Sequence, residues 1–353
     1  MPITVRSYAK TNLGLRIGAL RPDGFHELRT VYQTIALHDT IEVEVERGTG
    51  IEIRSEDPRV PKDQSNTCYR IVELAMAELK ARGRVVIEIE KRLPVQGGLG
   101  GASGNAVATL LALELALKKK LSGAEKLRIA AEVGSDLPLF LIGGTVLGVG
   151  RGEEVYPLPD LPSVACVVAL PEIGVSTPEA FADWDLLLGR QSLSSEQRLA
   201  EPGSAWTGKS ARPYMGNASP TSNSKLTVSD PSDRMNELGR EFSAWLSSAS
   251  GVPVSKGRGR AETSLLDLVR TGIENDFEKV VFPKYPELRK VKSVLEQAGA
   301  FYASLSGSGS ATYGLFASRT KAEQAVARLG KAGISAVATT TLTRRQYWKK
   351  ISE

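Results

Sequence analysis

Cysteine and histidine are scarce in this chain. Its 353 residues include two of each, Cys68 and Cys166, and His26 and His38. Two thiols cannot form a disulfide framework and two imidazoles cannot form a zinc cluster, so we expect no protein-bound metal site. So low a cysteine content is typical of a reducing compartment, and we predict a cytoplasmic protein.

Long apolar runs are also missing. No segment approaches the roughly 20 apolar residues that a membrane span needs, and MPITVRSYAK lacks the apolar centre of a signal peptide. The net charge of +5 favours anionic ligands. It does not require nucleic acid, because the one obvious basic run, Lys118–Lys120, ends a predicted helix, where cations suit the dipole. We therefore expect a small molecule as partner, with no nucleic acid and no membrane.

The first 160 residues predict a domain of mixed α and β structure. ITVRSYAKTNLGLRIG is apolar with polar interruptions, and TIEVEVE, GIEIRS and RVVIEIEKR alternate with period two, as half-buried strands do. We predict one helix from Asn66 or Thr67 to Gly83, a second over about Gly104–Lys119, and a third in SGAEKLRIAAEVG. The strand spacing indicates a largely antiparallel or mixed sheet.

A second domain is predicted after a break at Pro159–Pro162. Its C-terminal part reads, in order, as helix, strand, glycine loop, strand, helix and strand, a compact α+β pattern of ferredoxin-like type. The segment from about Leu188 to Glu262 is rich in Ser, Gly and Pro, which predicts a mostly disordered insertion in which RMNELGREFSAWL could form a docked helix. We predict domains at 1–160 and 161–353, with the insertion at about 190–262.

The strongest local signal is the glycine-rich segment PVQGGLGGASGNA between a strand and a helix. Glycines let the backbone approach a ligand, and a helix N-terminus offers unpaired N–H groups to phosphate. Ser103 adds a hydroxyl where phosphate or its magnesium would sit. The segment is neither a Walker A sequence nor a dinucleotide fingerprint. These residues favour phosphate binding over a flexible strand-to-helix turn.

Three polar features elsewhere each allow two interpretations. Lys10 and Asn12 share one face of an apolar strand, so Lys10 either needs a buried partner or reaches solvent from an edge strand. Asp136 in VGSDLPLFLIGG either carries chemistry or caps the next helix. Phe25 and His26 lie side by side in a predicted hairpin, either as a packed tip or as a binding site.

Taken together, these segments resemble the GHMP kinase superfamily. AKTNLGLRI with RPDGFHEL, PVQGGLGGASGNA, GSDLPLFL, GVGRGEEVYPL and SLSGSGSATYGLF follow its order and spacing over about residues 5–185 and 263–342. The resemblance implies a two-domain α+β fold, with a ribosomal-protein-S5-domain-2-like N-terminal ATP domain and a ferredoxin-like C-terminal domain. K-x-N, DG-[aromatic]-H-x-L and GSDLP together narrow the resemblance to the ATP-dependent kinases of non-mevalonate isoprenoid biosynthesis, whose substrate carries a cytidine diphosphate group.

The resemblance also implies roles for individual residues. Lys10 and Asp136 match the catalytic pair, and Asn12, Phe25, His26 and Phe181 match positions that hold the cytidine, with the base between the two phenylalanine rings. Positions that bind ATP are matched by Asn66 and by Pro94, Val95, Gln96, Gly97, Gly98, Leu99, Gly100, Gly101, Ala102, Ser103 and Gly104. The sequence departs from the family at Gly104, where a loop serine is usual, and at Phe25, where tyrosine is commoner. The missing serine hydroxyl could weaken binding of ATP or magnesium.

The implied reaction is phosphoryl transfer from ATP, with Mg²⁺ bound to its phosphates, to the 2-hydroxyl of 4-diphosphocytidyl-2-C-methyl-D-erythritol. Asp136 would accept the hydroxyl proton and Lys10 would keep Asp136 ionised. Three alternatives stay open: a homoserine or mevalonate type of GHMP kinase, a diphosphate decarboxylase, and a non-catalytic sensor with the same fold. We expect a monomer or a weak homodimer.

Overall fold

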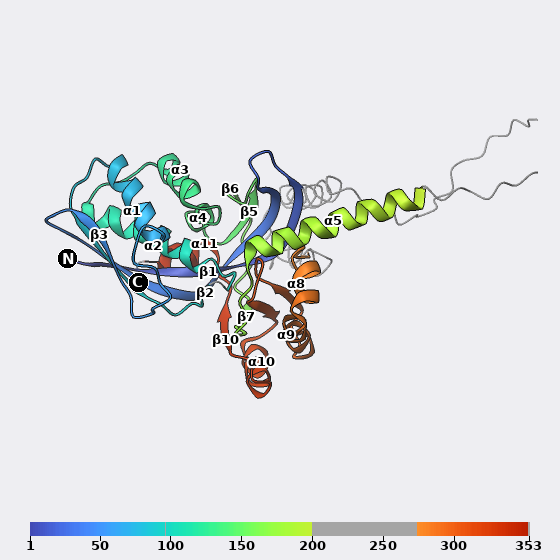
Figure 1. Cartoon of the computed structure of the whole chain (residues 1–353). Coiled ribbons are helices and arrows are strands. Elements are labelled where there is room, and N and C mark those ends of the chain that lie inside the picture. Colours follow the sequence, from blue (N-terminus) through green and yellow to red (C-terminus); the bar gives the residue numbers. More distant parts are fainter. Residues whose placement is uncertain (96, 200–273, 352–353) are drawn as a thin grey trace, which may run out of the picture.

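The structure is a computed structural model that describes residues 1–95, 97–199 and 274–351 (Figure 1). Most of the predicted insertion, including RMNELGREFSAWL, lies outside the described residues. Helix α5 (Thr177–Leu199) continues into its first residues. Within the described ranges, no helix has the length and apolarity to cross a membrane.

The N-terminal sheet is built around two long strands. β1 (Ile3–Leu20) and β2 (His26–Glu46) form an antiparallel hairpin. The sheet order is β3-β4-β2-β5-β6, and β1 also pairs with β2. The remaining strands are β3 (Gly50–Arg54), β4 (Arg84–Glu90), β5 (Thr145–Val149) and β6 (Glu154–Pro157). Only β3 and β4 pair in parallel among these strands, which confirms the predicted mixed sheet.

Four helices pack on this sheet and bury one apolar core with it (Figure 1). They are α1 (Thr67–Glu78), α2 (Gly101–Leu117), α3 (Gly123–Val133) and α4 (Leu137–Phe140). Two predicted boundaries are wrong. α1 ends before Gly83, because Lys80 has a positive φ of 47° and leaves the helix. α2 starts three residues before Gly104, since the Gly104 N–H already donates to the carbonyl of Gly100 at 2.8 Å.

The C-terminal sheet has four antiparallel strands in the order β10-β7-β9-β8. The strands are β7 (Ala165–Ala169), β8 (Tyr302–Leu305), β9 (Thr312–Phe316) and β10 (Ala336–Thr340). Helices α9 (Pro286–Gln297) and α10 (Arg319–Lys331) pack on the sheet with a core of their own. This order, with its two covering helices, confirms the predicted ferredoxin-like pattern.

Among the described residues, three helices were not predicted: α5 and two further ones. α8 (Glu278–Lys284) lies beside α5, and α11 (Arg344–Lys350) follows the last strand. The signal for α11 was present, because Thr343 and Gln346 form a capping box with reciprocal side-chain hydrogen bonds. The Tyr347 hydroxyl donates to the carbonyl of Phe140 at 2.7 Å, so α11 packs against α4.

The two sheets share a core and meet beside the glycine-rich loop. Leu13 and Ile35 of the hairpin pack with Val168 and Leu315 of the C-terminal sheet. The loop after β8 contacts the loop before α2: the Ser306 hydroxyl donates to the Gly98 carbonyl at 2.9 Å. Residues far apart in the chain therefore meet at this junction. The domain boundary at 160 stays a prediction.

Candidate active site

A cavity of about 700 Å³ opens at the junction of the two sheets. We call it the central cavity. β1, β2, the glycine-rich loop, α4 and α5 all contribute to its lining. The structure brings six of the predicted site residues into this lining: Lys10, Asn12, Phe25, His26, Asp136 and Phe181. Gly98, Gly100 and Ser103 of the loop line it as well, so the predicted phosphate and cytidine regions face one space.

Lys10 is buried, with 3% of its surface exposed. Its ammonium lies 3.1 Å from Oδ2 of Asp136 and donates to Oδ1 of Asn12 at 2.8 Å. The Asn12 amide in turn donates to the Thr30 hydroxyl at 2.7 Å. The alternative of an edge-strand lysine reaching solvent is wrong. The sequence had suggested a buried partner, and the partner is Asp136.

Asp136 stands at the N-cap position of α4, yet its side chain makes no capping hydrogen bond. Oδ2 meets the Lys10 ammonium, and Oδ1 accepts a hydrogen bond from the Tyr32 hydroxyl at 3.0 Å. The side chain remains one-third exposed toward the cavity. The helix-capping interpretation therefore does not describe what this carboxylate contacts. A carboxylate held on both oxygens and open to a cavity is suited to accept a proton.

The glycine-rich loop takes conformations that only glycine adopts readily. Gly98 has a φ of +73° and Gly100 a φ of +68°, and a Cβ on Gly98 would lie 2.1 Å from the Ser306 carbonyl oxygen. Gly100 is also the N-cap of α2 and provides no side-chain cap. The first three N–H groups of the helix therefore lack an intrahelical acceptor, as an anion site requires.

A second cavity of about 300 Å³, the loop cavity, lies on the other side of this segment. Nearly all of the predicted ATP positions line it, from Pro94 to Ser103, together with Lys91 and Asn105; Gln96 lies outside the described residues. Asn66 lines it too, but its side chain caps α1. Its Oδ1 accepts from the Cys68 N–H at 2.9 Å and its Nδ2 donates to the Pro61 carbonyl at 2.7 Å. Asn66 therefore shapes this wall, and its amide is already satisfied by the chain.

Gly104 does not face either cavity. A Cβ there would lie 2.9 Å from the Ser7 hydroxyl and 2.9 Å from the Tyr8 carbonyl, so the position packs against β1. The expectation that the missing serine hydroxyl weakens binding of ATP or magnesium therefore finds no support in the geometry. Glycine here instead permits close packing of α2 on the sheet.

The two phenylalanines predicted to hold the cytidine each contact another side chain. Phe181 stacks on His26, with ring centroids 4.9 Å apart and an interplanar angle of 8°, and makes a T-shaped contact with Phe277, the residue before α8. Phe25 is half exposed, and the Arg151 guanidinium lies 4.9 Å from its ring centroid. Both rings line the central cavity, and a cytosine base between them stays a prediction.

Among the side chains of the central cavity that sequence reasoning missed are Tyr32, Arg151 and Asp185. Asp185 lies 2.8 Å from Nε2 of His26 and could have been found, because it follows Phe181 by four residues on one helix face. Tyr32 is the strand partner of Asn12, but its contact with Asp136 spans 104 residues of sequence. No local pattern gives a contact of that range.

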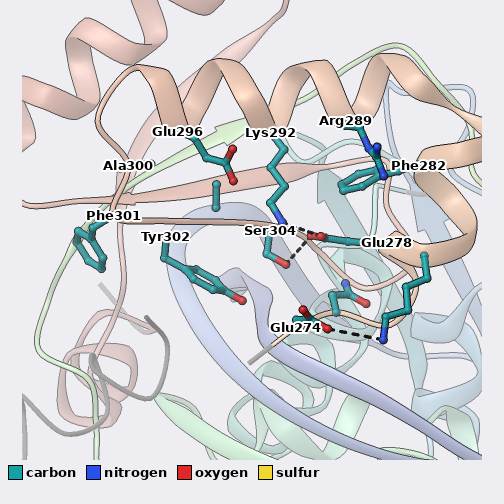
Figure 2. A pocket seen from close by; sticks show the side chains of 13 residues that line it. Glu274, Glu278, Phe282, Arg289, Lys292, Glu296, Ala300, Phe301, Tyr302 and Ser304 are labelled. Carbon is teal, nitrogen blue, oxygen red and sulfur yellow. Dashed lines mark hydrogen bonds and ion pairs between the residues drawn. The ribbon is translucent and has the colours of Figure 1, made fainter. Parts of the chain in front are cut away.

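A third depression, of about 410 Å³, lies at the outer edge of the C-terminal sheet between β8 and helices α8 and α9 (Figure 2). Its charged side chains are largely paired with each other. Glu278 accepts from the Lys292 ammonium at 2.7 Å, from the Ser304 hydroxyl at 3.0 Å and from the Leu305 N–H at 2.9 Å. The Glu278 carboxylate thus accepts a hydrogen bond from a main-chain N–H of β8, the edge strand of the C-terminal sheet. These charged side chains therefore have a structural role.

The described residues contain no group of three or more His, Cys, Asp and Glu side chains that could hold a metal ion. Cys68 and Cys166 are free and buried. Burial raises the pKa of both thiols to about 12, so neither is a reactive nucleophile at neutral pH.

Comparison with known proteins identifies the family of this chain. The GHMP kinases N-terminal domain matches residues 66–144, and the GHMP kinases C-terminal domain matches residues 261–335. The chain is 35% identical over 329 residues to a 4-diphosphocytidyl-2-C-methyl-D-erythritol kinase of Solibacter usitatus, which covers 93% of this chain and 85% of the relative. A kinase of the same name from Acaryochloris marina is 33% identical over 321 residues, covering 91% and 89%.

Solved structures give the same result. A crystal structure of 4-(cytidine 5'-diphospho)-2C-methyl-D-erythritol kinase superposes with a TM-score of 0.64 at 26% identity, covering 96% of this chain and 99% of that one. A homoserine kinase from Cytophaga hutchinsonii has a TM-score of 0.63 at 19% identity over 97% and 95%, which shows the shared fold alone. The chain belongs to the GHMP kinase superfamily and, within it, to the family of 4-diphosphocytidyl-2-C-methyl-D-erythritol kinases.

Proposed function

We propose that this chain transfers the γ-phosphate of ATP to the 2-hydroxyl of 4-diphosphocytidyl-2-C-methyl-D-erythritol, a step of non-mevalonate isoprenoid precursor biosynthesis. The observation that carries the proposal is the pairing of Lys10 with Asp136 in a cavity that also exposes Gly98, Gly100 and Ser103. A phosphoryl donor bound at the loop and a hydroxyl acceptor beside Asp136 would meet in one space.

Phosphoryl transfer requires mainly positioning and charge neutralisation from a protein. The free N–H groups and the dipole at the start of α2 suit the phosphates of ATP. Asp136 accepts the proton of the attacking hydroxyl, and Lys10 stabilises the ionised carboxylate. Asn12 orients Lys10 through the hydrogen bond between their side chains.

Magnesium fits this site only as a companion of ATP. The part of the chain that the structure describes has no carboxylate cluster, and Ser103 is a lining hydroxyl near the phosphate region. We infer that phosphate oxygens and water hold most of the coordination of Mg²⁺. Bound there, Mg²⁺ would neutralise charge that develops on the transferred group.

The lining of the cavity favours a cytidine substrate over the alternatives. A homoserine or mevalonate type of kinase would have no use for a wall built from Phe25, His26 and Phe181. A non-catalytic sensor would not need a buried lysine paired with a carboxylate, since such a pair is costly to desolvate. We further infer a cytoplasmic enzyme, and its oligomeric state, monomer or weak homodimer, stays a prediction.

Titration with nucleotides tests the cytidine assignment. CDP should bind with millimolar or better affinity and UDP distinctly more weakly, because polar groups that meet the cytosine edge would be left unpaired by uracil. Phe181→Ala should weaken CDP binding by roughly 1–3 kcal/mol, the scale of base–aromatic stacking, with little effect on a non-hydrolysable ATP analogue. His26 must release one face of Phe181, or stack on the base itself, for this contact to form.

Tyr156→Ala is the matched control, since Tyr156 is a half-exposed aromatic residue on β6 outside the central cavity. It should leave both affinities unchanged. Equal affinity for CDP and UDP in the wild type would remove the cytidine assignment and leave only a GHMP kinase.

A further inference from the structure

We propose that Tyr32 is a positioning residue for Asp136: its hydroxyl fixes the orientation of the carboxylate for proton transfer. The inference rests on the proposed function, because it assigns a role in the same reaction. The motifs that carry the family resemblance do not include Tyr32, and no local pattern in the sequence points to it.

The contact geometry assigns one donor to each carboxylate oxygen. The Lys10 ammonium, from β1, lies 3.1 Å from Oδ2, and the Tyr32 hydroxyl, from β2, donates to Oδ1 at 3.0 Å. With Lys10 alone, the carboxylate could rotate about its terminal bond and exchange its oxygens. A second donor on the other oxygen removes this freedom, and proton transfer depends on such orientation.

Tyr32 is itself rigidly held. Its side chain is 2% exposed, and its strand pairs with β1 at Asn12 and with β5 at Val146. The Lys10 ammonium lies 5.5 Å from the centroid of its ring, so the two donors to Asp136 also contact each other. Because the ring is buried on a strand paired on both sides, the hydroxyl of Tyr32 has one fixed position.

Gly148 of β5 and Gly152 of the turn between β5 and β6 leave room for the Tyr32 ring and its hydroxyl. A Cβ on Gly148 would lie 2.5 Å from the ring of Tyr32, and a Cβ on Gly152 would lie 2.5 Å from its hydroxyl oxygen. Gly152 also has a φ of +101°, which favours glycine. Two glycines therefore accommodate Tyr32, and one of these contacts is with the hydroxyl that a phenylalanine would lack.

The hydroxyl is a permanent donor. Burial, followed by the charge of Asp136, raises the pKa of Tyr32 well above 10, so the phenol stays protonated at every pH at which a kinase works. Arg151 and Glu153, two other charged residues of this region, pair with each other at 2.9 Å. The Asp136 carboxylate thus has Lys10 on one oxygen and Tyr32 on the other.

The test is steady-state kinetics of the full chain with ATP and the proposed acceptor, in Tyr32→Phe and in the double variant Asp136→Asn/Tyr32→Phe. In Tyr32→Phe, kcat should fall about 3–10-fold while KM changes little, because the carboxylate loses the donor that orients it. In the Asp136→Asn background, which has no carboxylate to orient, the same substitution should change kcat little.

Tyr347→Phe is the matched control. Its hydroxyl is equally buried and bonds the main chain of α4, the helix that Asp136 precedes, without touching the carboxylate. It should lower thermal stability and leave kcat unchanged. An unchanged kcat in Tyr32→Phe, an equal loss in both single variants, or the same loss in the Asp136→Asn background would overturn the inference. A wild type that phosphorylates no acceptor would instead overturn the proposed function.

Discussion

Asp136→Asn should lower kcat by about 10²–10⁴, the usual contribution of a general base, while affinity for ATP stays near that of the wild type. The amide keeps the size of the side chain: its oxygen can accept from Lys10 while its NH2 group donates to the Tyr32 hydroxyl oxygen, so the local structure should survive. It cannot accept the proton of the attacking hydroxyl. The loop that would hold ATP lies in another element and keeps its glycine geometry.

The control for this variant is Asp183→Asn. Asp183 forms an ion pair with Lys284 at 2.9 Å and lines neither the central cavity nor the loop cavity. It should retain wild-type kcat and KM in a steady-state assay. If Asp136→Asn keeps more than half of the wild-type activity, Asp136 has a structural role and the assignment of the base is wrong.

Gly98→Ala should lower kcat/KM by about 10²-fold, the scale of a misplacement of about 1 Å at a reacting group. The new Cβ would lie 2.1 Å from the Ser306 carbonyl oxygen, which is main chain and cannot rotate away. The residue also holds a φ of +73°, which costs an alanine roughly 1–2 kcal/mol. The glycine-rich loop before α2 and the loop after β8 must therefore separate, and the region proposed to bind phosphate moves with them.

Steady-state kinetics and thermal unfolding together distinguish this effect from general instability. Gly123→Ala is the control, because Gly123 begins α3 and a Cβ there would meet nothing within 4 Å. Gly123→Ala should leave kinetics unchanged and stability equal or higher. Wild-type kinetics in Gly98→Ala would show that the close approach of the two loops has no catalytic consequence.

Local patterns predicted much of the fold because they reflect local physics. The period-two segments became strands, and the capping serine and glutamate of SGAEKLRIAAEVG became the start of α3. The pairing of Lys10 with Asn12 followed from their spacing on one strand. The early start of α2 was missed, because it depends on the conformation of Gly100, which the sequence allows without requiring.

The site was harder to predict where it depends on contacts between distant segments. The contact of His26 with Asp185 spans 159 residues, and that of Tyr32 with Asp136 spans 104. The stacking of His26 on Phe181 was missed for the same reason, since family resemblance places residues in a site without giving their mutual geometry. The sequence prediction also omitted α5, whose Ala180 and Trp184 pack into the core before the predicted insertion begins.

The most direct test of the account is ADP release by the purified chain with ATP and Mg²⁺ and a panel of hydroxyl acceptors. The panel contains 4-diphosphocytidyl-2-C-methyl-D-erythritol, homoserine and mevalonate. The account predicts rapid ADP release with the first acceptor alone, together with a new phosphomonoester on a product that retains its diphosphate. Comparable turnover of homoserine or mevalonate, or no turnover of any acceptor, would contradict it.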